Sequence, residues 1–192
     1  MKNFIESLLQ ACRSAVRRAS ESLSLLVNSK VSGDVQGVTL MPLESLLVKF
    51  QGIQDQVLGV ATRIEGELKG FLFLIIDIDL VNHLLDLVLT NYKPYIREED
   101  LTMNLEEDII KETANVIIGS FISELNNMLK LSVNYNLPSI AVDVIAVLLD
   151  QLCANLALEC RNVLVFHINL KFAEHRHTVS IIFLLKPLGE NL

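Results

Sequence analysis

The chain has 192 residues, of which half are hydrophobic and a fifth are charged. Such a chain can bury a sizeable core, which is typical of a well-packed globular protein and excludes a disordered one. The formal charge of −7 argues against a nucleic acid as partner, because a phosphate backbone attracts basic surfaces. The most apolar window, 70–89, contains Asp77, Asp79, His83 and Asp86, so we expect no membrane insertion.

The first residues contain no clean apolar segment, since Glu6 and Arg13 already carry charge, and we therefore expect no secretory signal. The three cysteines form an odd set without a CxxC pair: Cys12, Cys153 and Cys160. We interpret them as reduced, buried thiols of a cytoplasmic protein.

The first half of the chain predicts a helix, a strand, a paired set of strands and a second helix, at 3–29, 35–41, 56–64 with 68–76, and 80–89. Ser32-Gly33-Asp34 is typical of a turn that ends the first helix. The segment 43–52 is ambiguous between a helical turn and an extended piece. Residues 91–102, with an acidic stretch, predict a linker.

The second half predicts a long helix, a strand, a helix and two long strands, at 104–130, 131–136, 142–158, 162–172 and 177–185. Pro138 favours a loop before the second of these helices, and we expect Asp143 to cap that helix, with fixing of the preceding loop as the alternative. Residues 173–176 predict the turn between the last two strands.

The second half repeats the pattern of the first. At an offset of 102 residues, Leu23 meets Leu125 and Val31 meets Val133, so apolar positions stay in phase. The predicted fold is α+β, a pseudo-two-fold repeat that forms one continuous antiparallel sheet with two long helices packed on it. We expect a single domain over 1–192, with pseudo-repeats at about 1–95 and 100–190.

A polar stripe follows the helix predicted at 104–130. Taking Asp108 as zero, Glu112 lies at about 40°, Asn115 at about −20° and Gly119 at about 20° around the axis. Glycine costs about 1 kcal/mol against alanine inside a helix, and it leaves a bare patch beside the stripe. Apolar residues gather on the opposite side: Ile110, Ala114, Ile117, Phe121, Leu125 and Met128.

Glu112 and Asn115 cannot act as a nucleophile and its base, because asparagine does not titrate. An amide can hold a water and a carboxylate can meet a cation, which suits positioning and electrostatics in a partner's active site. The first helix lacks these groups, since the offset of 102 places Gln10, Arg13 and Arg17 there. The sequence therefore predicts one site, with a merely solvated helix face as the alternative.

Other polar residues give weaker signals. His175 and His177 favour a solvated turn over a metal site, and His83 and His167 favour packing, so we expect no metal. Three serines near the end of the first helix favour a helix surface over nucleophiles: Ser20, Ser22 and Ser24. No Gly-rich phosphate loop, GxSxG or HExxH motif occurs in the sequence.

The spacing Asp108-x3-Glu112-x2-Asn115-x3-Gly119 resembles the signature of the CheC/CheX/FliY phosphatases of bacterial and archaeal chemotaxis. The resemblance follows the chain in order, at 22–26, 38–42, 60–76, 137–143, 163–172 and 179–187. It implies a CheC-like fold and hydrolysis of the aspartyl phosphate of a CheY-like response regulator.

The same resemblance implies roles for four residues. Glu112 would pair with the regulator's active-site lysine, and Asn115 would insert beside the aspartyl phosphate and orient the attacking water. Asp108 and Gly119 are expected to contact the partner, with Gly119 allowing close approach. Mg²⁺ is expected on the regulator, and the chain itself would need no cofactor.

CheC proteins carry a second ExxN in their first helix, where this chain has Gln10 and Arg13, so it resembles a one-site member. Two alternatives stay open: a non-catalytic module like the middle domain of FliM or one that binds CheD, and a packing domain with a solvated stripe. CheD and a second copy of this chain are further candidate partners.

Overall fold

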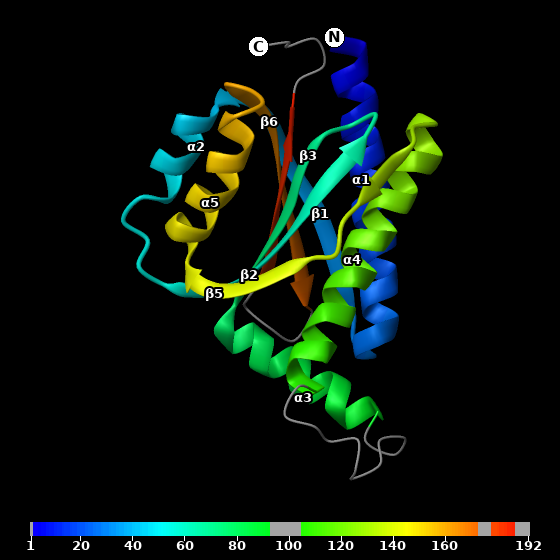
Figure 1. Ribbon diagram of the computed structural model, residues 1–192. Coiled ribbons are helices and arrows are strands. Elements are labelled where there is room, and N and C mark those ends of the chain that lie inside the picture. Colours follow the sequence, from blue (N-terminus) through cyan, green and yellow to red (C-terminus); the bar gives the residue numbers. More distant parts are fainter. Residues whose placement is uncertain (1, 93–104, 173–177, 187–192) are drawn as a thin grey trace.

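The computed structural model describes residues 2–92, 105–172 and 178–186 (Figure 1). These residues form both helices and strands, and their strands pair antiparallel, as expected for an α+β protein. In chain order they are α1 (Lys2–Val27), β1 (Val31–Pro42), α2 (Leu43–Phe50), β2 (Gln56–Gly66), β3 (Gly70–Asp77), α3 (Ile78–Tyr92), α4 (Leu105–Leu129), β4 (Val133–Tyr135), β5 (Ser139–Val144), α5 (Ile145–Ala157), β6 (Asn162–Phe172) and β7 (Thr178–Leu185).

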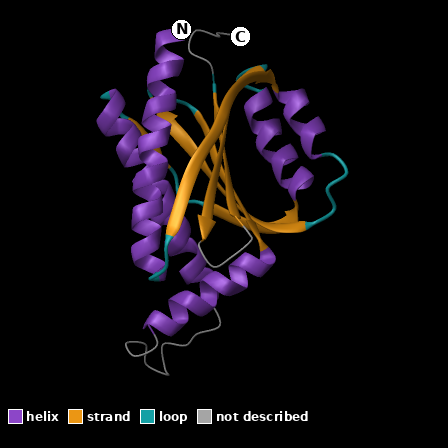
Figure 2. Cartoon of the chain, turned by 180° about the vertical axis from the view of Figure 1, so that it is seen from behind, coloured by secondary structure: helices purple, strands orange, loops and turns teal. Residues whose placement is uncertain are grey.

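The described strands pair into one antiparallel sheet in the order β1-β6-β7-β3-β2-β4. β5 pairs with the first part of β2 and β4 with its last part, so both lie along the same side of β2. One edge of the sheet is therefore β1, and the other is β4 followed by β5 (Figure 2). The predicted continuous antiparallel sheet is confirmed.

Helices cover both faces of this sheet (Figure 1). α1, α3 and α4 pack on one face, and α2 and α5 pack on the other. Successive residues of β3 serve the two cores in turn: Leu72 and Leu74 lie in the core under α1 and α4, whereas Phe71 and Phe73 lie under α5. The two predicted long helices are thus confirmed, and the two short helices add a third layer.

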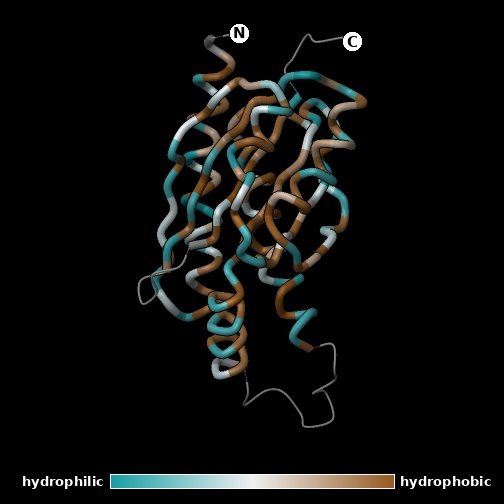
Figure 3. Tube along the Cα trace, turned by 90° about the vertical axis from the view of Figure 1, so that its left-hand side faces the viewer, coloured by the Kyte–Doolittle hydropathy of each residue, from teal (hydrophilic) through white to brown (hydrophobic). Residues whose placement is uncertain are grey.

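The hydropathy of the chain follows these layers. Figure 3 shows the helices alternating between hydrophobic and hydrophilic residues along their turns, as expected for helices with one buried face. Strand β3 is buried from Gly70 to Ile76, because helices cover it on both sides.

The two halves of the chain match at the predicted offset. A shift of 102 residues carries Val31–Pro42 onto 133–144, the span of β4 and β5. The same shift carries Leu43, where α2 begins, onto Ile145, where α5 begins. The order of strands is also symmetric about the β7–β3 pair, since β6 and β2 follow on either side and β1 lies opposite β4 and β5.

The buried faces of α1 and α4 correspond at the same offset. Each buried residue of α4 lies 102 positions after a buried residue of α1: Thr113, Ala114, Ile117, Ile118, Phe121, Ile122 and Leu125. Both helices are followed by a residue with positive φ, Asn28 at 49° and Lys130 at 55°. These matches support the predicted pseudo-repeat, while the single-domain assignment of 1–192 stays a prediction.

A side chain near the end of each long helix fixes the start of the next strand. In the first half, Val31 N–H donates to Ser24 Oγ over 2.9 Å. In the second half, Asn126 Nδ2 donates to Val133 O over 2.7 Å, and Val133 N–H donates to Asn126 Oδ1 over 3.0 Å. Ser24 and Asn126 occupy equivalent repeat positions, so the serine expected on the helix surface has a structural role.

The predicted turn at Ser32-Gly33-Asp34 is wrong, because β1 begins at Val31 and these residues pair with β6. Gly33 is required by the close approach of α1 rather than by a turn. A Cβ at Gly33 would lie 2.4 Å from Val16 Cγ1 and 2.7 Å from Ser20 Oγ.

The predicted loop and helix after Pro138 are also revised. Ser139–Val144 forms β5, and α5 begins only at Ile145. Asp143 therefore lies in a strand, and its Oδ1 accepts a hydrogen bond of 2.7 Å from Val144 N–H. Val144, at the N-cap position of α5, makes no side-chain cap, so the capping prediction for Asp143 is wrong.

The linker predicted at 91–102 begins too early, because residues 91–92 still belong to α3, and its remainder lies outside the described residues. The turn at 173–176 and the histidines His175 and His177 also lie outside the described residues. Among the residues that are described, no helix is both long enough and apolar enough to cross a membrane.

Candidate functional site

α4 is held against α1 and the sheet, which fixes the direction of its outer face. Ser14 Oγ donates to Glu124 Oε1 over 2.7 Å, and Ser120 Oγ lies 3.0 Å from Ser22 Oγ, so the two helices are joined at two levels. On the core side, the ring of Phe121 packs edge to face against Phe183, with centroids 5.4 Å apart.

The predicted apolar face of α4 is confirmed over most of its length. Ala114, Ile117, Phe121 and Leu125 are buried, and Ile110 packs at the margin of the same core. Met128 is the exception: it is 46% exposed, in the last turn of α4 beyond Leu125.

The polar stripe lies on the opposite, outer side of α4. Asp108 and Glu112 are exposed, and Asn115 and Gly119 are half-buried. Within the described part of the chain, no hydrogen bond or ion pair engages the side chains of Glu112 or Asn115. The stripe is therefore not tied up in internal hydrogen bonds, and both groups can meet an external partner.

The start of α4 makes this surface acidic. Glu106, Glu107 and Asp108 occupy its first turn, where carboxylates also stabilise the helix dipole. Lys111 Nζ lies 2.7 Å from Glu107 Oε1, and this hydrogen bond raises the pKa of the ammonium group. Lys111 is thus paired with Glu107, which leaves the carboxylate of Glu112 available to another cation.

The outer face of α1 has a different chemistry at equivalent positions. Gln10, Arg13 and Arg17 are all exposed and stand where α4 has Glu112, Asn115 and Gly119. The carboxylate–carboxamide pair therefore occurs on one of the two long helices.

The structure adds Tyr135 to this surface, which the sequence analysis did not identify. A Cβ built at Gly119 would lie 3.2 Å from Tyr135 Oη, so the tyrosine of β4 fills part of the space that the glycine leaves. Tyr135 is 37% exposed. No local sequence signal could have found this contact, because it joins residues of different elements across a tertiary approach.

The remaining titratable candidates do not form a second site of this kind. Burial raises the pKa of the Cys12 and Cys153 thiols, that of Cys153 to about 11, which makes them poor nucleophiles. Burial and the nearby Lys49 lower the pKa of His167. In residues 2–92, 105–172 and 178–186, no three His, Cys, Asp or Glu side chains cluster as a metal site would need.

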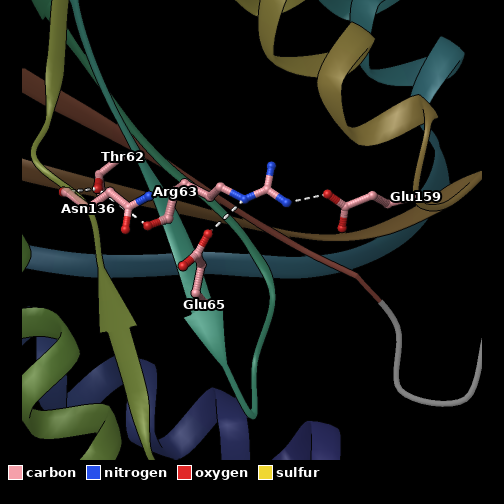
Figure 4. A network of polar contacts seen from close by, with 5 residues as sticks. All are labelled: Thr62, Arg63, Glu65, Asn136 and Glu159. Atoms are coloured by element: carbon pink, nitrogen blue, oxygen red, sulfur yellow. Dashed lines mark hydrogen bonds and ion pairs between the residues drawn. The ribbon is translucent and has the colours of Figure 1, made fainter.

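A cavity of about 320 Å³ lies on the other face of the sheet, between β2, the β4–β5 segment and α5. Arg63, which lines it, is ion-paired with Glu65 and Glu159 (Figure 4). The guanidinium of Arg63 also lies over the ring of Phe71. This cavity lies across the sheet from the polar stripe on α4.

Comparison with known proteins finds similarity both in sequence and in structure. No protein-family model matches the chain. The CheY-P phosphatase CheC of Bacillus subtilis is 22% identical over 134 residues, which are 69% of this chain and 63% of CheC. The match thus spans less than two thirds of the length of that relative.

Solved structures share the fold over almost the whole chain. FliY of Thermotoga maritima has a TM-score of 0.69 at 16% identity, covering 96% of this chain and 91% of FliY. The FliG–FliM complex of Helicobacter pylori gives 0.59 at 12% identity, covering 96% and 94%. The CheX–CheY–BeF3–Mg²⁺ complex of Borrelia burgdorferi gives 0.53 at 12% identity, covering 96% and 98%.

The relation rests on two separate findings. The sequence of the chain is similar to that of CheC, and its fold is that of FliY, CheX and the FliM middle domain. The chain is therefore similar to CheC in sequence, and it shares the fold of the CheC/CheX/FliY group of chemotaxis proteins.

Proposed function

We propose that the protein hydrolyses the aspartyl phosphate of a CheY-like response regulator, using Glu112 and Asn115. The observation that carries this proposal is the free pair on the outer face of α4. Glu112 is exposed and Asn115 half-buried one turn of helix apart, and neither has a hydrogen bond or ion pair among the described residues. A carboxylate and a carboxamide held on a rigid helix can enter a shallow site on another protein.

In the proposed reaction, a water molecule attacks the phosphorus of the regulator's aspartyl phosphate. A new bond forms between the water oxygen and phosphorus, the bond from phosphorus to the aspartate oxygen breaks, and inorganic phosphate and the free carboxylate result. The Asn115 amide orients this water through hydrogen bonds, and it takes no proton because an amide does not titrate. The water's proton passes to the phosphate product or to solvent.

Glu112 contributes binding and orientation. Its carboxylate pairs with the lysine of the regulator's active site, which fixes Asn115 relative to the phosphoryl group. The exposed acidic turn before it, with Asp108, favours the approach of a cationic rim. Mg²⁺ is bound by the regulator in this proposal.

The comparisons support this proposal in substrate class. The relative CheC is named a CheY-P phosphatase, and a protein with the same fold, CheX, has been solved together with CheY, BeF3 and Mg²⁺. If this chain acts on the same kind of partner, it works in the cytoplasm, where response regulators are found. The partial length of the CheC match makes the activity a proposal for this chain.

A second candidate function is a non-catalytic interaction module in chemotaxis or flagellar signalling. The fold similarity to FliM in its complex with FliG favours this candidate. It predicts binding of a partner without faster loss of phosphate, so the same assay separates the two functions. CheD binding and self-association stay predictions, each testable by mixing the purified proteins.

The proposal is tested by release of phosphate from a phosphorylated cognate regulator. Glu112→Ala and Asn115→Ala are each expected to reduce the release rate toward the regulator's spontaneous rate. The repeat supplies matched controls, because Gln10→Ala and Arg13→Ala alter exposed residues at equivalent positions of α1. If all four variants release phosphate as the unmodified protein does, the proposed site on α4 is wrong.

A further inference from the structure

Tyr135 lies beside the polar stripe in a way that the stripe alone does not explain. Its hydroxyl is placed 3.2 Å from where a Cβ of Gly119 would stand, and Gly119 is one helical turn from Asn115. Four residues of helix span about 6 Å along the axis. The tyrosine therefore stands at the rim of the surface that carries Glu112 and Asn115.

The position of Tyr135 is fixed on both sides along the chain. Before it, Asn126 holds both backbone groups of Val133, and Ser132 N–H donates to Glu67 Oε2 over 2.5 Å. After it, Asn136 is held in the network that Figure 4 shows: Asn136 N–H donates to Arg63 O over 3.1 Å, and Thr62 Oγ1 donates to Asn136 O over 2.6 Å.

The hydroxyl itself is available. Among the described residues, no hydrogen bond to Tyr135 Oη is found, and the side chain is 37% exposed. A phenol can donate one hydrogen bond and accept another, and its ring adds apolar contact area with few torsions to immobilise. Tyrosine is accordingly enriched in protein interfaces.

The repeat shows that this arrangement belongs to the half with the Glu–Asn pair. The position equivalent to Tyr135 is Gly33, and the position equivalent to Gly119 is the exposed Arg17. In the first half, the glycine is on the strand and the larger residue is on the helix. The second half reverses this, which leaves room on α4 for the tyrosine hydroxyl.

We propose that Tyr135 is a docking residue, whose hydroxyl hydrogen-bonds to the phosphorylated receiver domain and sets the affinity of the complex. This inference rests on the proposed function. A folded partner typically covers about 800 Å² on each side of an interface. A receiver domain whose phosphoryl group reaches Asn115 therefore extends past one further turn of α4 and covers Gly119 and Tyr135.

The test is the steady-state hydrolysis of the phosphorylated regulator by Tyr135→Phe, which removes only the hydroxyl. We expect KM to rise about tenfold with kcat unchanged, the effect of one hydrogen bond to a charged or polar partner. The melting temperature should stay that of the unmodified protein. A KM within twofold of the original overturns the inference. A tenfold fall of kcat with KM unchanged overturns it as well.

A second variant tests the contact between the tyrosine and the helix. Gly119→Ala places a Cβ 3.2 Å from Tyr135 Oη and must displace the hydroxyl by a few tenths of an ångström. We expect Gly119→Ala to raise KM in the original protein and to change it little in Tyr135→Phe, where the Oη is absent. Equal, additive effects in both backgrounds contradict the inference.

Failure of this inference can be told apart from failure of the proposed function. If Asn115→Ala abolishes turnover and Tyr135→Phe has no effect, the function stands and the docking role falls. If the protein binds the regulator without hydrolysing it, the proposed function falls. In that case the same tenfold loss is expected in the Kd of Tyr135→Phe for the regulator, and an unchanged Kd overturns the docking role.

Discussion

Replacing Asn126 by alanine removes the two side-chain hydrogen bonds that hold Val133, the first residue of β4. The resulting loss of folding stability can be worked out from the structure. Asn126 makes two hydrogen bonds to Val133, of 2.7 and 3.0 Å, and Val133 is 2% exposed. Each intramolecular hydrogen bond contributes about 1 kcal/mol, and a buried backbone group left unpaired costs about 1–3 kcal/mol. We expect Asn126→Ala to lower the free energy of unfolding by about 2–3 kcal/mol.

Urea denaturation followed by circular dichroism measures this loss, with the slope m expected to stay constant. In a thermal scan, the same loss lowers Tm by about 4–12 °C for a protein of this size. The matched control is Asn127→Ala, since Asn127 is the exposed neighbour on the same helix. A loss below about 0.5 kcal/mol, or one equal to that of the control, would refute the reasoning.

Two further predictions concern packing and pH. Gly33→Ala should destabilise the protein by about 1–3 kcal/mol, because its Cβ would lie 2.4 Å from Val16 Cγ1. The control is Gly37→Ala in the same strand, whose Cβ would meet nothing within 4 Å and which should be nearly neutral. Equal melting temperatures of the two variants would contradict this prediction. Burial, and secondarily Asp150, raises the pKa of Cys153 from 9.0 to about 11, so the unfolded chain loses the thiol proton first. The free energy of unfolding should therefore fall from pH 9 to 11 by more in the original protein than in Cys153→Ala. If the urea midpoints of both proteins fall equally over this pH range, Cys153 is not the cause.

The repeat could be predicted because apolar residues recur at equivalent positions in the two halves of the chain. Leu23 and Leu125, or Val31 and Val133, keep the same burial in both halves, and burial depends on helical and strand periodicity. The direction of the polar stripe followed from the same periodicity, since Glu112 lies on the side of α4 opposite Ala114 and Ile117.

The wrong predictions concern residues whose type is explained by a tertiary contact rather than by local structure. Ser32-Gly33-Asp34 has the composition of a turn, but Gly33 is needed because α1 passes close to β1. Asp143 has the position of a helix cap, but it lies in an edge strand that pairs with β2. Hydrogen bonding and close approach between distant elements are not encoded in local propensity.

Tyr135 shows the same limit within the site. The segment 131–136 could be predicted as a strand, and Gly119 could be singled out as unusual in a helix. The contact between Tyr135 and Gly119 depends on the pairing of β4 with the end of β2 and on the hydrogen bonds of Asn126 to Val133. The glycine that suggested room for an external partner has a partner within the chain as well.

The central claim is that Asn115 orients the water that removes phosphate from a response regulator. The most direct test is the rate constant of dephosphorylation at a saturating concentration of the Asn115→Ala variant. Binding of the phosphorylated regulator to this variant is measured in parallel. The account predicts a rate about 100-fold or more below that of the unmodified protein, with binding retained. A rate equal to that of the unmodified protein would contradict it.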